Sequence, residues 1–221
     1  MSTPTPQHRY GVLVPVKPPP VAKSRLAPLG DQVRTELAAA FALDTVVAVL
    51  ESPAVGCVLA VTDDHILAAA LADVGAMVIP DGVSDDLNGS LVLAAAELAR
   101  RFPDLRPAAV CADLPALRAE ELSRALAEAG ADTMSFVADA EGQGTTVVAA
   151  ADVASFHPRF GVGSAQAHRA DGAREIELAD VPSLRRDVDT PDDLAAAQEL
   201  GVGPRTAFVS TVMLGPGSPR L

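Results

Sequence analysis

The sequence contains few aromatic residues and very few lysines or cysteines. None of its 221 residues is tryptophan, and aromatic residues make up 3% of a chain that is 49% hydrophobic. Alanine, valine and leucine must therefore fill the core, which suits helices packed on a parallel sheet. The two cysteines, Cys57 and Cys111, fall in apolar runs. We expect both to be buried free thiols, a state typical of a reducing compartment.

Positive charge is also scarce, and long apolar runs are missing. The net charge is −12 at pH 7, which argues against nucleic acid or an anionic membrane as a general partner. No apolar run approaches the roughly 20 residues of a membrane helix, and the N-terminus lacks the apolar core of a signal peptide. These features predict a cytoplasmic protein. The length favours one domain, which we place at residues 11–204, between a flexible N-terminus (1–10) and a C-terminal tail (205–221); a homodimer is left open.

The two lysines of the chain, Lys17 and Lys23, lie in one loop together with Arg25. This loop follows the apolar run 11–16, which is short enough for a strand buried on both faces. Open α/β sheets hold phosphate groups beyond the carboxyl end of such a strand, and lysine serves as a point charge for phosphate. The pattern indicates an anion-binding loop. The alternative is a solvated loop in a protein that uses little lysine.

Apolar runs and helical periods alternate as far as residue 130. This spacing predicts parallel strands joined by crossover helices, and so an α/β fold with one mostly parallel sheet flanked by helices. After residue 133, two apolar runs separated by a short turn predict a β-hairpin. The expected strands are 11–16, 56–61, 75–80, 108–112, 134–138, 145–150 and 176–178. The expected helices are 31–50, one starting at 62–64, 89–101, 119–129, 164–168 and 191–200; no clear period follows residue 201, and we expect the last seven residues to be mobile.

Three aspartates occupy positions that suit a divalent metal. Asp113 follows the apolar run 108–112, and the carboxyl end of such a strand faces the ligand crevice of an open α/β sheet. Asp187 and Asp189 are two residues apart, so in extended chain both point to one side, where a hard cation would offset their repulsion. The alternatives are a turn for Asp113 and helix capping for the pair. Capping accounts for Thr190, Pro191 and Asp193 but leaves Asp187 and Asp189 unexplained.

A glycine-rich turn at residues 161–163 precedes the short helix expected from Ser164. Glycine lets the backbone approach a ligand closely, and a helix start offers free N–H groups to an anion; the alternative for Ser164 is an N-cap only. Thr145 and Thr146 would add hydroxyl donors. The four histidines are not spaced as metal ligands, so we expect surface or loop positions for them, with His168 and Arg169 as weaker candidates for the anion site. They are His8, His65, His157 and His168.

The combination of a cationic loop, carboxylates and amide donors, with no evident general base, suits phosphoryl or nucleotidyl transfer to an oxygen that is already ionised. Such chemistry depends on positioning and charge neutralisation more than on proton removal. Metal ions would bridge the attacking and leaving oxygens. The sequence contains neither a Walker motif nor G-x-G-x-x-G, so P-loop hydrolysis and hydride transfer are disfavoured.

A series of short motifs resembles the 2-phospho-L-lactate/phosphoenolpyruvate guanylyltransferases, which make the activated phospho-acid for coenzyme F-420. From about residue 12 to 204 these motifs are, in order, V-P-V-K, A-K-S-R-L-A-P, D-L-N, A-D-L-P-A-L, H-P-R-F-G-x-x-S, D-V-D-T-P-x-D-L and L-G-V-G-P. The resemblance implies a GT-A-like nucleotidyltransferase fold with a β-hairpin insertion on the acceptor side. It also implies a reaction in which the phosphate of phosphoenolpyruvate or 2-phospho-L-lactate attacks the α-phosphorus of GTP and pyrophosphate leaves.

The resemblance further implies a role for each candidate residue. Mg²⁺ would be held by Asp113, Asp187 and Asp189. The triphosphate would be bound by the catalytic cations Lys17, Lys23 and Arg25, with Asn88 near the nucleoside. The phospho-acid would be bound by Thr146, Gly161 and Ser164. The chain reads A-D-L-P where G-D-L-P is common, which leaves the metal ligand in place, and Gly163 stands where other residues are allowed. An alanine-rich, lysine-poor composition suggests a GC-rich bacterial genome, so we place phosphoenolpyruvate first among the acceptors.

Two other functions are compatible with these residues. One is a related nucleotidyltransferase that acts on a sugar phosphate or molybdopterin, although the glycine-rich L-A-G-G-x-S-x-R-M pattern of the molybdopterin type is missing. The other is a nucleotide-binding subunit without catalytic activity, against which the three aspartates argue.

Overall fold

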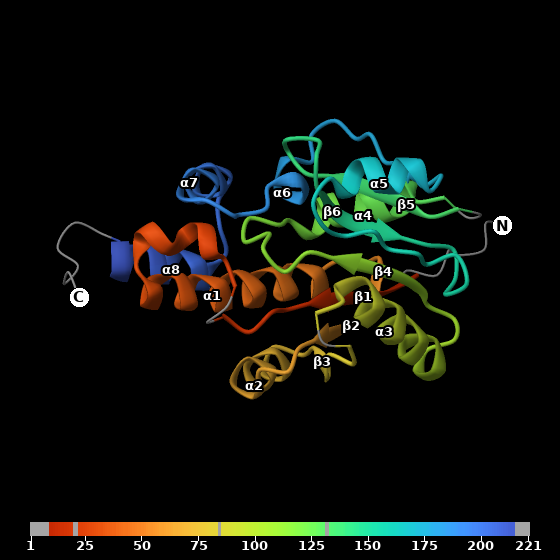
Figure 1. Ribbon diagram of the computed structural model, residues 1–221, viewed down its shortest axis with the longest axis horizontal. Helices are drawn as coiled ribbons and strands as arrows, with labels where there is room; N and C mark the ends of the chain where they lie inside the picture. The colour runs from red at the N-terminus through yellow and green to blue at the C-terminus, as the bar shows by residue number, and fades with distance from the viewer. Residues whose placement is uncertain (1–8, 20–21, 84, 131–132, 215–221) are drawn as a thin grey trace.

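A seven-stranded sheet in the order β3-β2-β1-β4-β6-β5-β7 runs through the molecule (Figure 1). The computed structural model describes residues 9–19, 22–83, 85–130 and 133–214, so the mobility expected of residues 1–8 and 215–221 lies outside the described residues. The strands are β1 (Tyr10–Pro15), β2 (Val55–Val61), β3 (Met77–Ile79), β4 (Arg106–Val110), β5 (Ser135–Ala138), β6 (Thr145–Ala149) and β7 (Arg174–Glu175). The helices are η2 (Ser24–Leu29, a 3-10 helix), α1 (Asp31–Leu50), α2 (His65–Asp73), α3 (Leu87–Arg101), α4 (Ala119–Glu128), α5 (Ser164–Ala170), α6 (Pro182–Arg185), α7 (Pro191–Leu200) and α8 (Pro204–Leu214).

The sheet is mostly parallel, which confirms the predicted α/β fold. Strand β1 pairs in parallel with β2 and β4, β2 with β3, and β5 with β7. The predicted hairpin, β5–β6, is antiparallel, and β6 also pairs antiparallel with β4, so the hairpin extends the same sheet. This order places the carboxyl ends of β1 and β4 side by side, at the edge where ligands bind to open α/β sheets.

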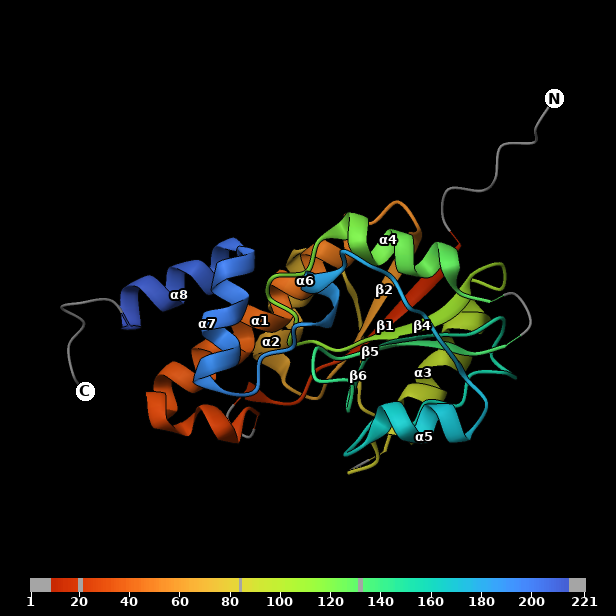
Figure 2. The same ribbon diagram turned by 90° about the horizontal axis from the view of Figure 1, so that it is seen from above.

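Helices cover both faces of the sheet because successive side chains of a strand point to opposite faces. Val12 and Val14 of β1 belong to a buried cluster with α1, α2 and α4, whereas Leu13 belongs to a cluster with α3 and α5. Figure 2 shows α4 on one side of the sheet and α3 with α5 on the other. Gly11 permits the close approach of α3, since a Cβ there would lie 2.3 Å from Cδ1 of Leu98.

A third buried cluster lies beside the sheet, beneath the loops that follow β1 and β4. It contains Leu26 of η2, Phe41 of α1 and Leu194 of α7, and Val209 of α8 packs against it. Helix α7 begins as the sequence predicts: Thr190 is the N-cap in a capping box with the third residue of the helix, and proline opens the first turn. The cluster therefore joins the first and last helices of the chain at one end of the molecule (Figure 1).

Helix α8 lies in a segment for which the sequence predicts no regular structure. Its start is fixed by buried Asp44 of α1, which accepts hydrogen bonds from the N–H groups of Thr206 (2.8 Å) and Arg205 (3.3 Å). A Cβ on Gly203 would lie 2.4 Å from Cγ of Asp44, so this close approach requires glycine. The buried residues of α8 are Thr206 and Ser210, and a buried face of polar residues carries no apolar period.

Three element boundaries differ from the expected ones in ways that matter for the site. Strand β4 ends at Val110, so Asp113 lies in the following loop and not at the end of the strand. Helix α3 begins at Leu87, so Asn88 is in its first turn. The small strand expected at 176–178 lies at Arg174–Glu175, where β7 pairs with β5. None of the helices in the described part of the chain is long and apolar enough to span a membrane.

Candidate active site

The loop after β1 holds Lys23 in an uncommon backbone conformation. Lys23 has a φ of 55°, in the left-handed region, which a residue other than glycine adopts rarely and often at functional sites. Arg34 of α1 supports the preceding residue by donating a hydrogen bond to the carbonyl oxygen of Ala22 over 2.6 Å. The turn directs Lys23 inward, and its side chain is only 12% exposed.

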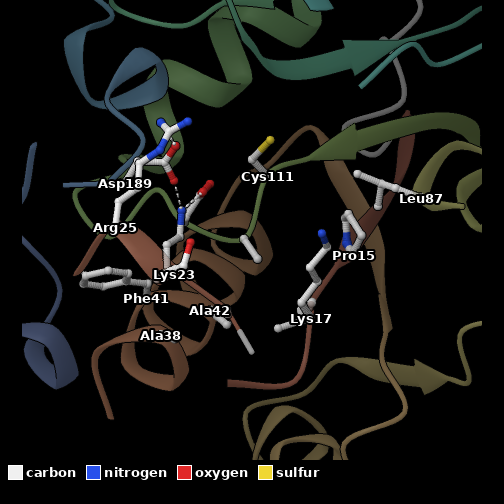
Figure 3. Close-up of a pocket in the computed structure, with 15 residues that line it drawn as sticks. Pro15, Lys17, Lys23, Arg25, Ala38, Phe41, Ala42, Leu87, Cys111 and Asp189 are labelled. Atoms are coloured by element: carbon white, nitrogen blue, oxygen red, sulfur yellow. Dashed lines mark hydrogen bonds and ion pairs between the residues drawn. The ribbon is translucent and has the colours of Figure 1, made fainter. Parts of the chain in front are cut away.

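Lys23 joins two of the three predicted aspartates. Its Nζ donates to Oδ2 of Asp113 and, over 2.7 Å, to Oδ1 of Asp189. Arg25 adds a longer ion pair, with 3.2 Å between Nη1 and Oδ2 of Asp189. Burial lowers the pKa of Lys23, but the charges of Asp113 and Asp189 outweigh burial, so the pKa of Lys23 is raised and the ammonium stays charged. Figure 3 shows Lys23 and Arg25 converging on Asp189.

Backbone hydrogen bonds hold the two aspartate-bearing segments against each other. The N–H of Val188 donates to the carbonyl oxygen of Asp113 over 3.0 Å, so the chain that carries Asp187 and Asp189 lies beside the Asp113 loop. Buried Thr45 of α1 spans Asp113 itself: its Oγ1 donates to the carbonyl oxygen of residue 112 (3.2 Å) and accepts from the N–H of residue 114 (3.1 Å). The backbone of Asp113 is therefore fixed from two sides.

Asp187 has further carboxylate neighbours, which Asp113 and Asp189 do not share. Its carboxylate oxygen lies within 4.8 Å of ligand atoms of Asp139 and Glu141, and this is the one group of three such residues found among those that the structure describes. Burial, and then the charge of Asp113, raise the pKa of Asp187 to about 7, although Lys23 opposes them. The three predicted aspartates thus reach one edge of the sheet, but Lys23 holds only Asp113 and Asp189.

The carboxylates fit a divalent cation. Oδ1 of Asp113 is buried and has no hydrogen-bond partner among the described residues, and a buried carboxylate oxygen without a partner is costly. Burial, and then the charge of Asp113, raise the pKa of Asp187 despite Lys23, so the charged form of this carboxylate would gain from a bound cation. A donor set of carboxylate oxygens is what hard divalent cations prefer.

A cavity of about 400 Å³ opens between this cluster and the end of β1. Its walls include Lys23, Arg25, Asp113, Cys111 and Phe41, and Lys17 borders it as well. In Figure 3 Lys17 lies across the cavity from Lys23. Lys17 is exposed and makes no ion pair with any residue that the structure describes. A cavity with a free ammonium on one side and an ammonium–carboxylate cluster on the other suits a polyanionic ligand bound together with cations.

The residues expected to bind the phospho-acid surround the start of β6 and of α5. The carbonyl oxygen of Thr146 accepts a hydrogen bond from the N–H of Cys111 over 2.9 Å, so Thr146 lies beside the chain that leads to Asp113. Oγ1 of Thr146 is buried and has no hydrogen-bond partner among the described residues. Gly161 and Gly163 have φ values of 140° and 70°, which favour glycine, and α5 begins at Ser164, directly after Gly163.

Asn88 is engaged with the protein's own backbone. Its Nδ2 donates to the carbonyl oxygen of Phe160 over 3.0 Å, and its Oδ1 accepts from the N–H of Phe160 over 2.8 Å. Asn88 therefore fastens the glycine turn to the first turn of α3. Contact between Asn88 and a nucleoside stays a prediction.

A family model decides the relationship of this chain to known proteins. The model described as "Guanylyl transferase CofC like" matches residues 10–204. The chain belongs to this guanylyl transferase family. The match ends at the first residue of α8, so the family region comprises the sheet, the cavity and all the candidate site residues.

Individual relatives agree with the family match. A phosphoenolpyruvate guanylyltransferase of Thermomonospora curvata is 47% identical over 211 residues, which cover 95% of this chain and 92% of the relative. Among solved structures, a nucleotidyl transferase from Methanothermobacter matches with a TM-score of 0.61 at 18% identity and covers 87% of this chain and 97% of that one. A Mycobacterium tuberculosis protein in complex with manganese matches with a TM-score of 0.53 at 22% identity, over 87% and 98% of the two chains. At these identities the two structures support the fold alone, and they confirm the predicted nucleotidyltransferase fold.

The structure of this guanylyl transferase family member also corrects two expectations and adds one residue. His168 is completely buried and is not a surface or loop residue, whereas His65 and His157 are exposed and His8 lies outside the described residues. Cys57 is a buried free thiol, but Cys111 is partly exposed. Thr45 was not expected at the site, because in the sequence it is one of many residues of an amphipathic helix and its bonding partners are more than 60 residues away.

Proposed function

We propose that the protein joins GMP from GTP to phosphoenolpyruvate, releases pyrophosphate, and forms enolpyruvoyl-2-diphospho-5'-guanosine for coenzyme F-420 biosynthesis. The observation that carries the proposal is the convergence of Lys23, Asp113 and Asp189 on a cavity at the carboxyl ends of β1 and β4, in a chain that the guanylyl transferase family matches over residues 10–204. A phosphoenolpyruvate guanylyltransferase at 47% identity supports the choice of acceptor.

The donor side of the site comprises Lys17, Lys23, Arg25, Asp113 and Asp189. When the α-phosphorus of GTP is attacked, negative charge grows on the departing pyrophosphate, and fixed cations stabilise that charge. Lys23 is positioned for this role because it is buried and charged. Arg25 is 71% exposed, so we assign it a weaker contact with the outer phosphates, and Lys17 would contact them from across the cavity.

The acceptor side comprises Thr146, Gly161 and Ser164. The hydroxyl of Thr146, which has no hydrogen-bond partner among the described residues, and the backbone N–H groups at the glycine turn are donors suited to the phosphate and carboxylate of a phospho-acid. One oxygen of the acceptor phosphate forms the new bond to the α-phosphorus as the bond from that phosphorus to the β-phosphate oxygen breaks. The second pKa of a phosphate monoester is about 6, so this oxygen is ionised at pH 7 and needs no general base.

Asp113, Asp187 and Asp189 would hold Mg²⁺, to which Oδ1 of Asp113 is suited because it has no hydrogen-bond partner in the described part of the chain. When bound, the metal ion supplies additional positive charge at the reacting phosphates. A manganese complex of a protein with the same fold supports a divalent metal in general.

An acceptor panel tests the function. Purified protein is mixed with MgCl₂, GTP and either phosphoenolpyruvate or 2-phospho-L-lactate, and pyrophosphate is followed with a coupled assay. We expect release with GTP, fastest with phosphoenolpyruvate, and little with ATP, CTP or UTP. An Asp113→Asn variant is the control for contaminating activity. The absence of release with both acceptors would reject the proposal, and equal rates with all four nucleotides would reject the guanine specificity.

Two further proposals concern the state of the protein. We propose a cytoplasmic location, since GTP and phosphoenolpyruvate are substrates of the cytoplasm, and a homodimer, which light scattering of the purified protein would test.

A further inference from the structure

His168 is a completely buried histidine next to the acceptor side of the site. The centroid of its ring lies 5.3 Å from that of Phe136, in a stacked arrangement, and 5.8 Å from that of Phe160, edge to face. Phe136 belongs to β5, and Phe160 immediately precedes the glycine turn at residues 161–163. The imidazole thus fills the space between the sheet and the turn.

Both nitrogens of this imidazole are used, which fixes its protonation state. The backbone N–H of Arg159 donates to Nε2 over 2.9 Å. A backbone N–H can only donate, so Nε2 carries no proton. The proton of the neutral ring is therefore on Nδ1, which lies 3.0 Å from Oγ1 of Thr145 and donates to that oxygen. An imidazolium would set an N–H of the ring against the N–H of Arg159.

The two hydrogen-bond partners of His168 lie close in sequence to the candidate acceptor residues. Thr145 directly precedes Thr146, and Arg159 lies two residues before Gly161. His168 itself is one turn after Ser164 in the same helix. The ring therefore links the three chain segments that carry Thr146, Gly161 and Ser164.

We propose that His168 is a positioning residue for the phospho-acid: by accepting the hydrogen bond of the Arg159 N–H, it holds the glycine turn in place relative to Thr146. This inference rests on the proposed function, since it concerns the acceptor of that same reaction. It assigns no contact between the ring and substrate, because the ring is completely buried.

The surroundings of the ring keep it neutral. Burial lowers the pKa of His168 to about 4, although a hydrogen bond with the backbone of Ser164 and the charge of Asp171 oppose this shift. The charged groups on the packed elements are Arg159 in the turn, which pairs with Asp171, and Arg169 of α5, which pairs with Glu175 of β7. Each of these cations is thus paired with a carboxylate, and the side chains of the two pairs make no hydrogen bond to the ring nitrogens of His168.

Two variants separate the two hydrogen bonds. The amide of Gln in His168→Gln can replace Nε2 as the acceptor for Arg159, whereas the shorter Asn in His168→Asn can replace Nδ1 but does not reach Arg159. Both lose the same stacking on Phe136, so a general loss of stability affects them alike. For each variant we would measure KM for phosphoenolpyruvate, KM for GTP, the melting temperature and the hydrogen-exchange rate of the Arg159 amide.

We expect His168→Asn to raise the KM for phosphoenolpyruvate by roughly tenfold or more, as the loss of one buried hydrogen bond predicts, and to speed exchange at Arg159. His168→Gln should stay within about threefold of wild type in both, and neither variant should change the KM for GTP more than about twofold. Equal effects of the two variants, equal shifts of both KM values, or an Arg159 amide that stays protected in His168→Asn would overturn the inference. If the wild-type protein released no pyrophosphate, the proposed function itself would be overturned, so a failure of the function can be told apart from a failure of the inference about His168.

Discussion

The donor side and the acceptor side are held in place by different kinds of contact. On the donor side, charged side chains hold one another: Lys23 lies between Asp113 and Asp189, and Arg25 adds a second cation. On the acceptor side, neutral groups hold the backbone: His168 binds Arg159, and Asn88 binds Phe160 through two hydrogen bonds.

This difference indicates how each side responds to substrate. Ion pairs among side chains can exchange partners without moving the backbone, so Lys23 can leave a carboxylate for a phosphate when GTP binds. A turn clamped through its own N–H and C=O groups stays in place, which favours a small acceptor that must be oriented precisely. We therefore expect changes on the donor side to affect turnover and the KM for GTP, and changes on the acceptor side to affect the KM for the phospho-acid.

Lys23→Ala should have the largest effect. It removes the buried cation and leaves Asp113 and Asp189 without it, so we expect kcat to fall by about 10³-fold, as for the loss of a preorganised electrostatic contact. Arg25→Ala is the matched control and should cost about tenfold or less, because Arg25 is largely exposed. Steady-state pyrophosphate release measures both. Near-normal turnover of Lys23→Ala would mean that the loop is a solvated surface segment without a role in the reaction.

Thr45→Val should come next, since it keeps the shape of the side chain but removes the hydroxyl that spans Asp113. Two hydrogen bonds to the Asp113 loop are lost, and one buried backbone N–H is left unpaired, so we expect a fall in kcat of roughly 10- to 100-fold. Thr45→Ser retains the hydroxyl and should stay close to wild type. If Val and Ser at this position behaved alike, the hydroxyl would have no part in placing Asp113.

Thr146→Val tests the acceptor side directly. The change removes a hydroxyl that has no partner within the described protein, so it should cost no stability. We expect the KM for phosphoenolpyruvate to rise by roughly tenfold, with the KM for GTP unchanged. A rise in the KM for GTP of the same size would mean that the two sides are not separate.

Asp44→Ala should affect stability and leave the reaction alone. Asp44 is adjacent to Thr45 in α1, but its carboxylate accepts hydrogen bonds from the first N–H groups of α8. Loss of such a helix cap costs about 1–2 kcal/mol, which urea denaturation would detect, while kcat should stay within about twofold. A large loss of activity would show that α8, beyond the region that the family model matches, supports the site.

The smallest expected effect is the loss of stability when the pH is lowered below neutral. The pKa of His168 is lowered to about 4 in the folded protein, against about 6.5 in the unfolded chain. Between these values the unfolded chain binds more protons, so stability falls as the pH drops from about 6.5 towards 4. Unfolding free energies at pH 7, 6 and 5 should decline more steeply for wild type than for His168→Gln. Parallel declines would mean that His168 takes up its proton without opposing folding.

The sequence points to the charged residues of the candidate site more readily than to the neutral ones, for a physical reason. Lysines in a lysine-poor chain and aspartates beside apolar runs stand out because charge is rare in such places. His168 and Thr45 do not stand out, since their roles depend on partners that only the folded chain brings near. Helix α8 was not predicted because it buries Thr206 and Ser210 and exposes Phe208, the reverse of an amphipathic pattern.

The parallel pairing of the first strands was predictable because alternation of apolar runs and helical periods constrains topology strongly. The exact end of β4 was not: Asp113 lies three residues beyond it, in a loop whose course depends on Thr45 and on the N–H of Val188. Neither contact is visible from local sequence.

The most direct test of guanylyl transfer is a phosphorus NMR spectrum of the protein with equal amounts of GTP and phosphoenolpyruvate and excess MgCl₂. We predict that both substrates decline together and that pyrophosphate and one unsymmetrical diphosphate, with two coupled resonances, appear in equal amounts. Appearance of GDP and inorganic phosphate, or of pyrophosphate without the coupled pair, would contradict transfer of GMP to the phosphate of the acceptor.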